Sequence, residues 1–89
     1  MPTVIVPALL RQLTNGQDRV AVRGTNVRQV IEDLERQFPG IKRHLVEDGD
    51  LKSGINVSVD GEMGIGGLTD PVKENSEIFF LPAIGGGLK

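Results

Sequence analysis

Residues 26–38 read NVRQVIEDLERQF. The apolar residues of this stretch recur at helical spacing and form a single stripe, which consists of Val27, Val30, Ile31, Leu34 and Phe38. Asn26 is a favourable N-cap, and Gln29 follows it at capping-box spacing. Pro39 and Gly40 then end the pattern. The stretch therefore predicts one amphipathic helix with one face to bury, and Glu32 and Arg36 on its polar side are spaced as an ion pair.

The segments on either side of this helix have the patterns of short strands. Alternating or β-branched runs predict strands at 3–6, 19–23, 55–59 and 77–81, with a short edge strand at 62–63. Asn15-Gly16 and Asp60-Gly61 are turn signals between them. Residues 8–13 and 41–46 fit short helical turns, and residues 47–50 fit a polar loop. Ile41 and Leu45 are expected to point inward.

One helix with one apolar stripe packs most economically across one face of a mixed sheet. The last strand then lies beside the first, which gives the α+β fold known as the β-grasp, or ubiquitin-like, fold with four to five strands. In this arrangement Ile78 and Phe80 face the helix together with Val4 and Val6. We expect a β-grasp domain over residues 1–84 and a flexible glycine-rich tail over 85–89.

The same alternation places other apolar side chains on the sheet face away from the helix. Ile5 and Phe79 project from that face, and Leu81 follows Phe79 with the same parity. An apolar patch there predicts a docking surface for a partner. The alternative is that these are isolated exposed apolar residues, which are common on protein surfaces.

Composition excludes several classes of function. With 89 residues the chain is one domain, and a net charge of −2 with 3% aromatic residues argues against nucleic-acid binding. The chain has no cysteine, and its single histidine, His44, cannot form a multi-histidine metal site. No run has the length of a membrane span and no secretory signal is seen, so we expect a cytoplasmic protein.

The glycine-rich stretch from Gly64 to Gly67 does not predict a phosphate-binding loop. Such a loop requires a following helix and a Lys-Ser/Thr pair, and this stretch has neither.

No pairing of nucleophile and base is visible in the sequence, so any reacting group is expected to be the main chain itself. Residues 81–89 read LPAIGGGLK, in which a slim glycine run follows the last strand. Residues 83–87 span up to about 17 Å when extended, enough to enter a partner's active site. The alternative is an ordinary frayed terminus.

The tail and an ordered set of further residues resemble the MoaD/ThiS-type sulfur carriers, above all their CysO-like branch. The sequence LPAIGGG is similar to the LPAVAGG ending of that family. The other matching residues, in order, are Pro7, Leu10-Arg11, Thr14, Gly16, Val30, Ile31, Asp33, Leu34, Glu35, Gly40-Ile41, Asn56-Val57 and Gly66-Gly67-Leu68. The resemblance covers nearly the whole chain.

The resemblance implies a carrier that is not itself an enzyme and binds no cofactor or metal. A ubiquitin-activating-type adenylating enzyme, using ATP and magnesium, would activate the carboxylate of Gly87. The segment Ala83, Ile84, Gly85 and Gly86 would enter that enzyme's active site. Sulfur would then give a thiocarboxylate, for a biosynthetic enzyme that makes cysteine, a related amino acid, thiamin, molybdopterin or another sulfur-containing product.

The chain departs from the family pattern at its end, because Leu88 and Lys89 follow Gly87 and block its carboxylate. Some members of the family carry short extensions that a metalloprotease removes, so we expect cleavage between Gly87 and Leu88. Otherwise the carrier is inactive as encoded, or the resemblance misleads about function. Two other functions stay open: a ubiquitin-like modifier joined to target lysines through its terminal glycine, and an interaction module with an inert tail.

Overall fold

The computed structural model describes residues 1–64 and 66–82. The strands are β1 (Thr3–Ile5), β2 (Arg19–Ala21), β3 (Val46–Glu47), β4 (Asp50–Leu51), β5 (Ile55–Val59), β6 (Glu62–Met63) and β7 (Glu77–Pro82). Within these residues the single α-helix is α1 (Val27–Gln37), and three short 3-10 helices are η1 (Ala8–Thr14), η2 (Lys42–His44) and η3 (Gly67–Thr69). No helix among these is long and apolar enough to cross a membrane.

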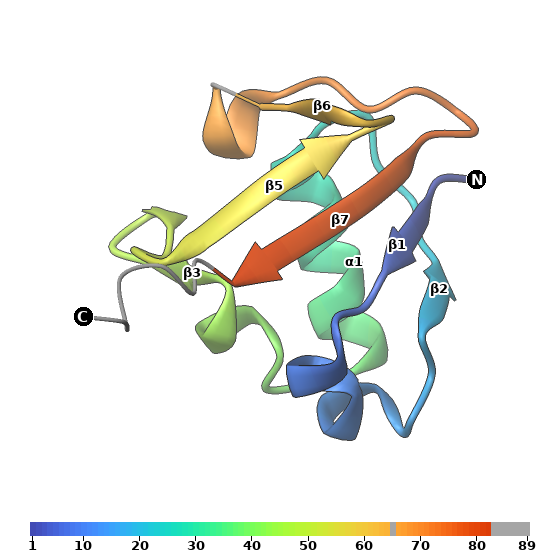
Figure 1. Ribbon diagram of the computed structural model, residues 1–89, viewed down its shortest axis with the longest axis vertical. Coiled ribbons are helices and arrows are strands. Elements are labelled where there is room, and N and C mark those ends of the chain that lie inside the picture. Colours follow the sequence, from blue (N-terminus) through green and yellow to red (C-terminus); the bar gives the residue numbers. More distant parts are fainter. Residues whose placement is uncertain (65, 83–89) are drawn as a thin grey trace.

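Five strands form one mixed sheet in the order β2-β1-β7-β5-β6. The central pair, β1 and β7, is parallel, and the other neighbours are antiparallel. Helix α1 lies across one face of this sheet, and the strands β1, β7 and β5 show their other face to the viewer in Figure 1. The predicted sheet with one main helix on one face, and with the last strand beside the first, is therefore confirmed.

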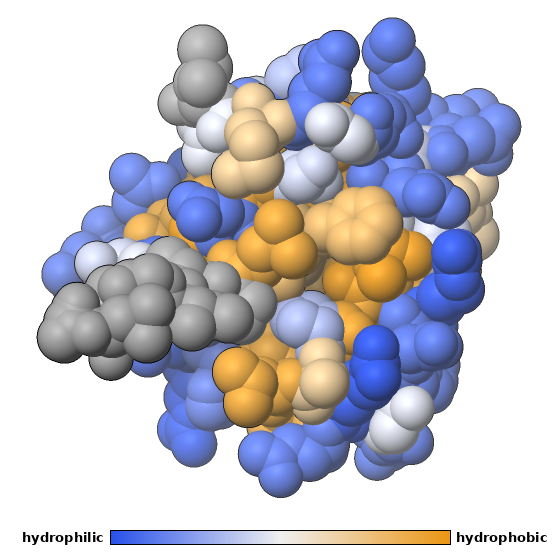
Figure 2. Space-filling view, viewed as in Figure 1, coloured by the Kyte–Doolittle hydropathy of each residue, from blue (hydrophilic) through white to orange (hydrophobic). Residues whose placement is uncertain are grey.

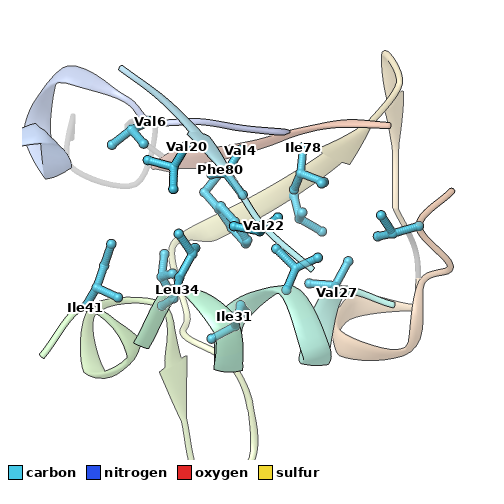
Figure 3. Packing of buried hydrophobic residues seen from close by; sticks show 14 of the residues in the cluster. Val4, Val6, Val20, Val22, Val27, Ile31, Leu34, Ile41, Ile78 and Phe80 are labelled. Atoms are coloured by element: carbon cyan, nitrogen blue, oxygen red, sulfur yellow. The ribbon is translucent and has the colours of Figure 1, made fainter. Parts of the chain in front are cut away.

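The core lies between α1 and the sheet (Figure 3). The predicted stripe is buried from Val27 to Leu34, and Ile78 and Phe80 meet it from β7 together with Val4 and Val6 from the N-terminal part of the chain. Phe38 is only partly buried and packs against the edge of this cluster. The inward positions of Ile41 and Leu45 are confirmed as well.

The helix begins as its sequence predicts, with one change in its cap. The Asn26 side chain accepts a hydrogen bond from the Gln29 N–H at 2.8 Å. The Gln29 side chain reaches back to the N–H of Thr25, one residue before the N-cap, at 2.8 Å. Two backbone donors at the start of the helix are thus satisfied by side chains, as in a capping box.

Three local predictions are corrected. The ion pair between Glu32 and Arg36 does not form, because Arg36 binds Asp33 at 2.6 Å while Glu32 pairs with a lysine, Lys42. Residues 47–50 are not a plain polar loop but the centre of the hairpin β3–β4, whose strands are too short to show an alternating pattern. Strand β2 ends at Ala21 rather than at Arg23, because Ala21 stands opposite Thr3, the first residue of its partner β1.

Candidate functional site

The central strand β7 leads directly toward the predicted reactive tail. It lies between β1 and β5, and its last residue, Pro82, stands opposite Ile55. The expected tail residues Ala83, Ile84, Gly85 and Gly86, the reactive Gly87 and the cleavage position at Leu88 all lie outside the described residues, so the predictions for them stay predictions. The same holds for the boundary between residues 84 and 85.

The strand register builds a row of side chains across the face that α1 leaves open. Ile5 on β1 stands opposite Phe79 on β7, and Phe79 stands opposite Ser58 on β5. Ser58 in turn stands opposite Met63 on β6. The row crosses four strands, which corresponds to about 14 Å at the usual spacing between strands. Figure 2 shows this face, with hydrophobic side chains gathered over its centre and hydrophilic ones around it.

The residues on this face are more exposed toward its edges than at its centre. Ile5 and Phe79 are partly exposed, whereas Leu81 is 41% and Met63 is 57% exposed. Ser58 is buried although it faces away from the helix. We refer to Ile5, Phe79, Leu81 and Met63 as the open-face patch.

The structure places the three predicted docking residues on one face but leaves docking itself untested. Ile5, Phe79 and Leu81 share the open face, as their parity predicted. Met63 lies on the same face but was not among the predicted docking residues, because its place depends on the turn before it. Asp60 and Gly61 both have positive φ, 54° and 85°, as in the tight two-residue turns that fix hairpin register.

Hydrogen bonds to Asp60 fix the beginning of β7. Its carboxylate accepts the Glu77 N–H at 2.9 Å and the Ser76 hydroxyl at 2.7 Å. The Glu77 N–H, followed by the Ser76 hydroxyl, holds the pKa of Asp60 below its ordinary value. The turn between β5 and β6 is thereby tied to β7 at the end of the strand opposite the tail.

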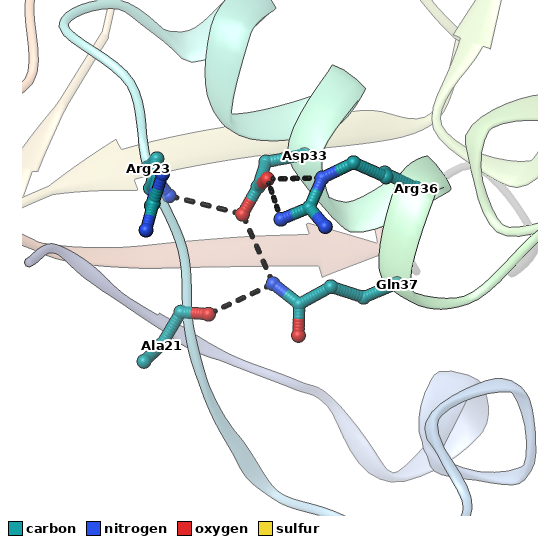
Figure 4. Close-up of polar contacts among 5 residues, drawn as sticks. All are labelled: Ala21, Arg23, Asp33, Arg36 and Gln37. Atoms are coloured by element: carbon teal, nitrogen blue, oxygen red, sulfur yellow. Dashed lines mark hydrogen bonds and ion pairs between the residues drawn. The ribbon is translucent and has the colours of Figure 1, made fainter.

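A second carboxylate, Asp33, ties α1 to the sheet edge (Figure 4). It accepts hydrogen bonds from the Arg23 N–H at 3.0 Å, from Gln37 at 3.0 Å and from two nitrogens of Arg36 at 3.0 and 2.6 Å. Gln37 also donates to the Ala21 carbonyl at 2.9 Å. Burial alone would raise the pKa of Asp33, but these hydrogen bonds and the Arg36 charge outweigh it and lower the pKa. Asp33 is therefore held as a structural anion rather than as a base.

The described residues contain no group of three or more His, Cys, Asp or Glu side chains that could hold a metal ion. His44 is partly exposed on η2. The candidate site on the described body is thus the central strand β7, which leads into the tail, together with the open-face patch on and beside that strand.

Comparison with known proteins identifies the family. The model of the ThiS family matches residues 4–87. The chain belongs to the ThiS family. The resemblance to MoaD/ThiS-type proteins is therefore confirmed, and the match runs to Gly87 without including Leu88 and Lys89.

Relatives of this ThiS-family chain include curated sulfur carriers. The chain is 34% identical over 90 residues to the sulfur carrier protein CysO of Mycobacterium tuberculosis and to that of Mycobacterium bovis, covering 96% of this chain and 97% of either relative. These relatives support a sulfur-carrier role.

Solved structures confirm the ubiquitin-like β-grasp fold. A chain of the BexX/CysO complex of Amycolatopsis orientalis superimposes with a TM-score of 0.91 at 38% identity, covering 93% of this chain and 96% of that one. CysO of M. tuberculosis gives a TM-score of 0.88 at 33% identity, with 93% and 99% covered. The small archaeal modifier protein 1 of Methanosarcina acetivorans gives 0.82 at 28% identity, with 97% and 95% covered.

Proposed function

We propose that this chain is a sulfur carrier that reacts through the α-carboxylate of Gly87 once Leu88 and Lys89 have been removed. The observation that carries the proposal is the family match up to residue 87, together with near-full-length similarity to sulfur carrier proteins. The relatives that support this role are named as carriers. In this proposal the chain is a substrate that its partner enzymes recognise.

The chemistry takes place in partner enzymes. A metalloprotease adds water to the Gly87 carbonyl and releases Leu88-Lys89 as a dipeptide. A ubiquitin-activating-type enzyme with ATP and magnesium then lets the freed carboxylate attack the α-phosphorus, and pyrophosphate leaves. A sulfur nucleophile displaces AMP from this acyl-adenylate and forms the thiocarboxylate. A sulfur-accepting biosynthetic enzyme takes the sulfur. Because activation consumes ATP, we assign the cycle to the cytoplasm.

Docking on the body makes delivery of the tail feasible. Ordering five tail residues costs roughly 5–10 kcal/mol in backbone entropy, so the activating enzyme must hold the body firmly. The open-face patch lies on and beside β7, the strand that leads into the tail. We propose that Ile5, Phe79 and Leu81 contact the activating enzyme, while residues 83–86 enter its active site.

The test compares residues 1–87 with the full chain of 89 residues. Each is mixed with the activating enzyme of the same cell, ATP and magnesium, and pyrophosphate release is measured. We expect release with the trimmed chain and none above background with the full chain, which has the same body but no free glycine carboxylate. Equal release from both, or none from either, contradicts the proposal.

A second candidate function has a specific observation in its favour. The likeness to a small archaeal modifier protein supports a ubiquitin-like modifier that forms isopeptide bonds with target lysines. The two functions share activation and differ in the product. Sulfur on free protein supports the carrier, whereas a ladder of covalent conjugates on a denaturing gel supports the modifier.

A further inference from the structure

Met63 occupies one end of the row that crosses the open face. The Gly64 N–H donates to the Val57 carbonyl at 3.0 Å, which makes Ser58 and Met63 a non-hydrogen-bonded pair, the kind whose side chains lie closer. Met63 thus continues the row from Phe79 and Ser58 out to the edge strand β6. Its side chain is 57% exposed, so a reagent in solution can reach it.

The thioether is chemically distinctive in this chain. The sequence has no Cys, Trp or Tyr and only two methionines. Met1 precedes β1, outside the sheet, whereas Met63 stands in the row. Among the residues on the described part of the open face, Met63 therefore carries the one group that peroxide converts readily.

We propose that Met63 is an oxidation site through which peroxide weakens docking of the activating enzyme. This inference rests on the proposed function. A lone pair of the Met63 sulfur attacks one oxygen of hydrogen peroxide, the O–O bond breaks, and the other oxygen leaves as water after proton transfer. The thioether is oxidised by two electrons to a sulfoxide, and the peroxide is reduced.

The sulfoxide at Met63 is expected to weaken docking without unfolding the chain. A sulfoxide is a polar group, so covering it with an apolar partner surface removes water from its oxygen without replacing the lost hydrogen bonds. In the free chain the oxygen can stay hydrated, because Met63 is exposed on a strand of two residues at the sheet edge. Oxidation should therefore weaken recognition while leaving the core intact.

The experiment uses residues 1–87 before and after treatment with hydrogen peroxide, with the site of the added oxygen located by peptide mass mapping. The measured quantities are KM and kcat of the carrier in pyrophosphate release. We expect oxidation to raise KM about tenfold with little change in kcat, as for loss of binding in docking. Reduction by methionine sulfoxide reductases with a dithiol should restore the original KM.

Two variants assign the effect to one sulfur. Each is compared with its own untreated sample. Met63→Leu should show no rise in KM after peroxide, whereas Met1→Leu should show the same rise as the unmodified sequence. The inference is overturned if oxidised and untreated chains have the same KM, or if Met63→Leu responds like the others. If the untreated chain is not activated at all, the proposed function fails first, and the inference falls with it.

Discussion

Among single residues, Asp33 makes the hydrogen bonds that hold α1 against the edge of the sheet. Its carboxylate receives donors from the chain after β2 and from the last turn of the helix. The Asp33 side chain is only 9% exposed, whereas its partner Arg36 lies at the surface. Through Gln37 the same cluster also covers an outward-facing carbonyl on the edge strand β2. Asp33 thus fixes the helix and closes a sheet edge.

Replacing Asp33 by alanine should lower the free energy of unfolding by about 1–3 kcal/mol, because the Arg23 N–H, Arg36 and Gln37 lose the charged acceptor that they share. Urea denaturation measures this change. The matched control is Glu32→Ala, which removes the neighbouring carboxylate, 53% exposed, and should change stability by only about 0.5 kcal/mol. Equal losses in the two variants would show that Asp33 has no special role.

At this scale the sequence predicted which residues are buried better than which residues bind each other. Helical spacing placed Val30 and Leu34 in the core, as found. The same spacing suggested Glu32 with Arg36, but Arg36 binds Asp33 instead, where two of its nitrogens donate to one carboxylate oxygen. Partner choice depends on residues far away in sequence, such as Arg23, and no local pattern contains that information.

At the scale of elements, the side chain of Asp60 attaches the turn between β5 and β6 to the start of β7. The Asp60 carboxylate accepts the N–H of Glu77, the first residue of β7, and the hydroxyl of the buried Ser76. The Asp60 N–H in turn donates to the Glu77 carbonyl at 2.9 Å. These bonds keep β5 and β7 in register, and that register places Ser58 and Phe79 opposite each other on the open face.

This attachment should make stability sensitive to acid. The Glu77 N–H and the Ser76 hydroxyl lower the pKa of Asp60 in the folded chain from its ordinary 3.8. The charged form is thus favoured by folding, so its contribution is fully present above the unfolded-state pKa and is lost as pH falls through the lower folded value. The pKa of Asp33 and that of Glu35 are lowered too, with the same sign.

Asp60→Asn should therefore reduce the loss of stability on acidification below about pH 5, because its side chain no longer titrates. Urea midpoints measured at several acidic pH values for both proteins test this. The variant should show a shallower decline than the original chain, with the remaining slope due to Asp33 and Glu35. An unchanged slope contradicts the role given to Asp60.

Long patterned elements were predictable, and very short ones were not. Eleven helical residues with a cap and a following Pro-Gly left little ambiguity about α1. The hairpin β3–β4 has two residues in each strand, too few for alternation to appear, so its residues read as a polar loop. The edge strand β6 is equally short, but the Asp60-Gly61 turn signal marked it.

At the scale of the molecule, the two faces of the sheet have different roles. One face is closed by α1 and supplies the core. The other carries the open-face patch, which lies on and beside β7, the strand that leads into the tail. Fold and open face followed from alternation in the sequence, because parity alone assigns a residue to a face. The chemistry of the tail came from family resemblance, since its residues lie outside the described structure.

Phe79→Ser in residues 1–87 should raise KM for activation about tenfold or more, because it removes an apolar contact at the centre of the patch. Pyrophosphate release against carrier concentration measures it. Phe38→Ser is the matched control, since Phe38 is also partly buried but follows the helix rather than the open face. A KM that rises equally in both variants, at a temperature where both are folded, would argue against docking through this face.

A sulfur carrier of this kind must end at a glycine with a free carboxylate in its own cell. The decisive measurement is the intact mass of the protein isolated from that cell, with its C-terminal peptide sequenced by mass spectrometry. We predict a population that ends at Gly87, part of it heavier by the difference between one sulfur and one oxygen atom. If every molecule still ends at Lys89, or if trimmed chains never carry sulfur under conditions of demand, the sulfur-carrier account is contradicted.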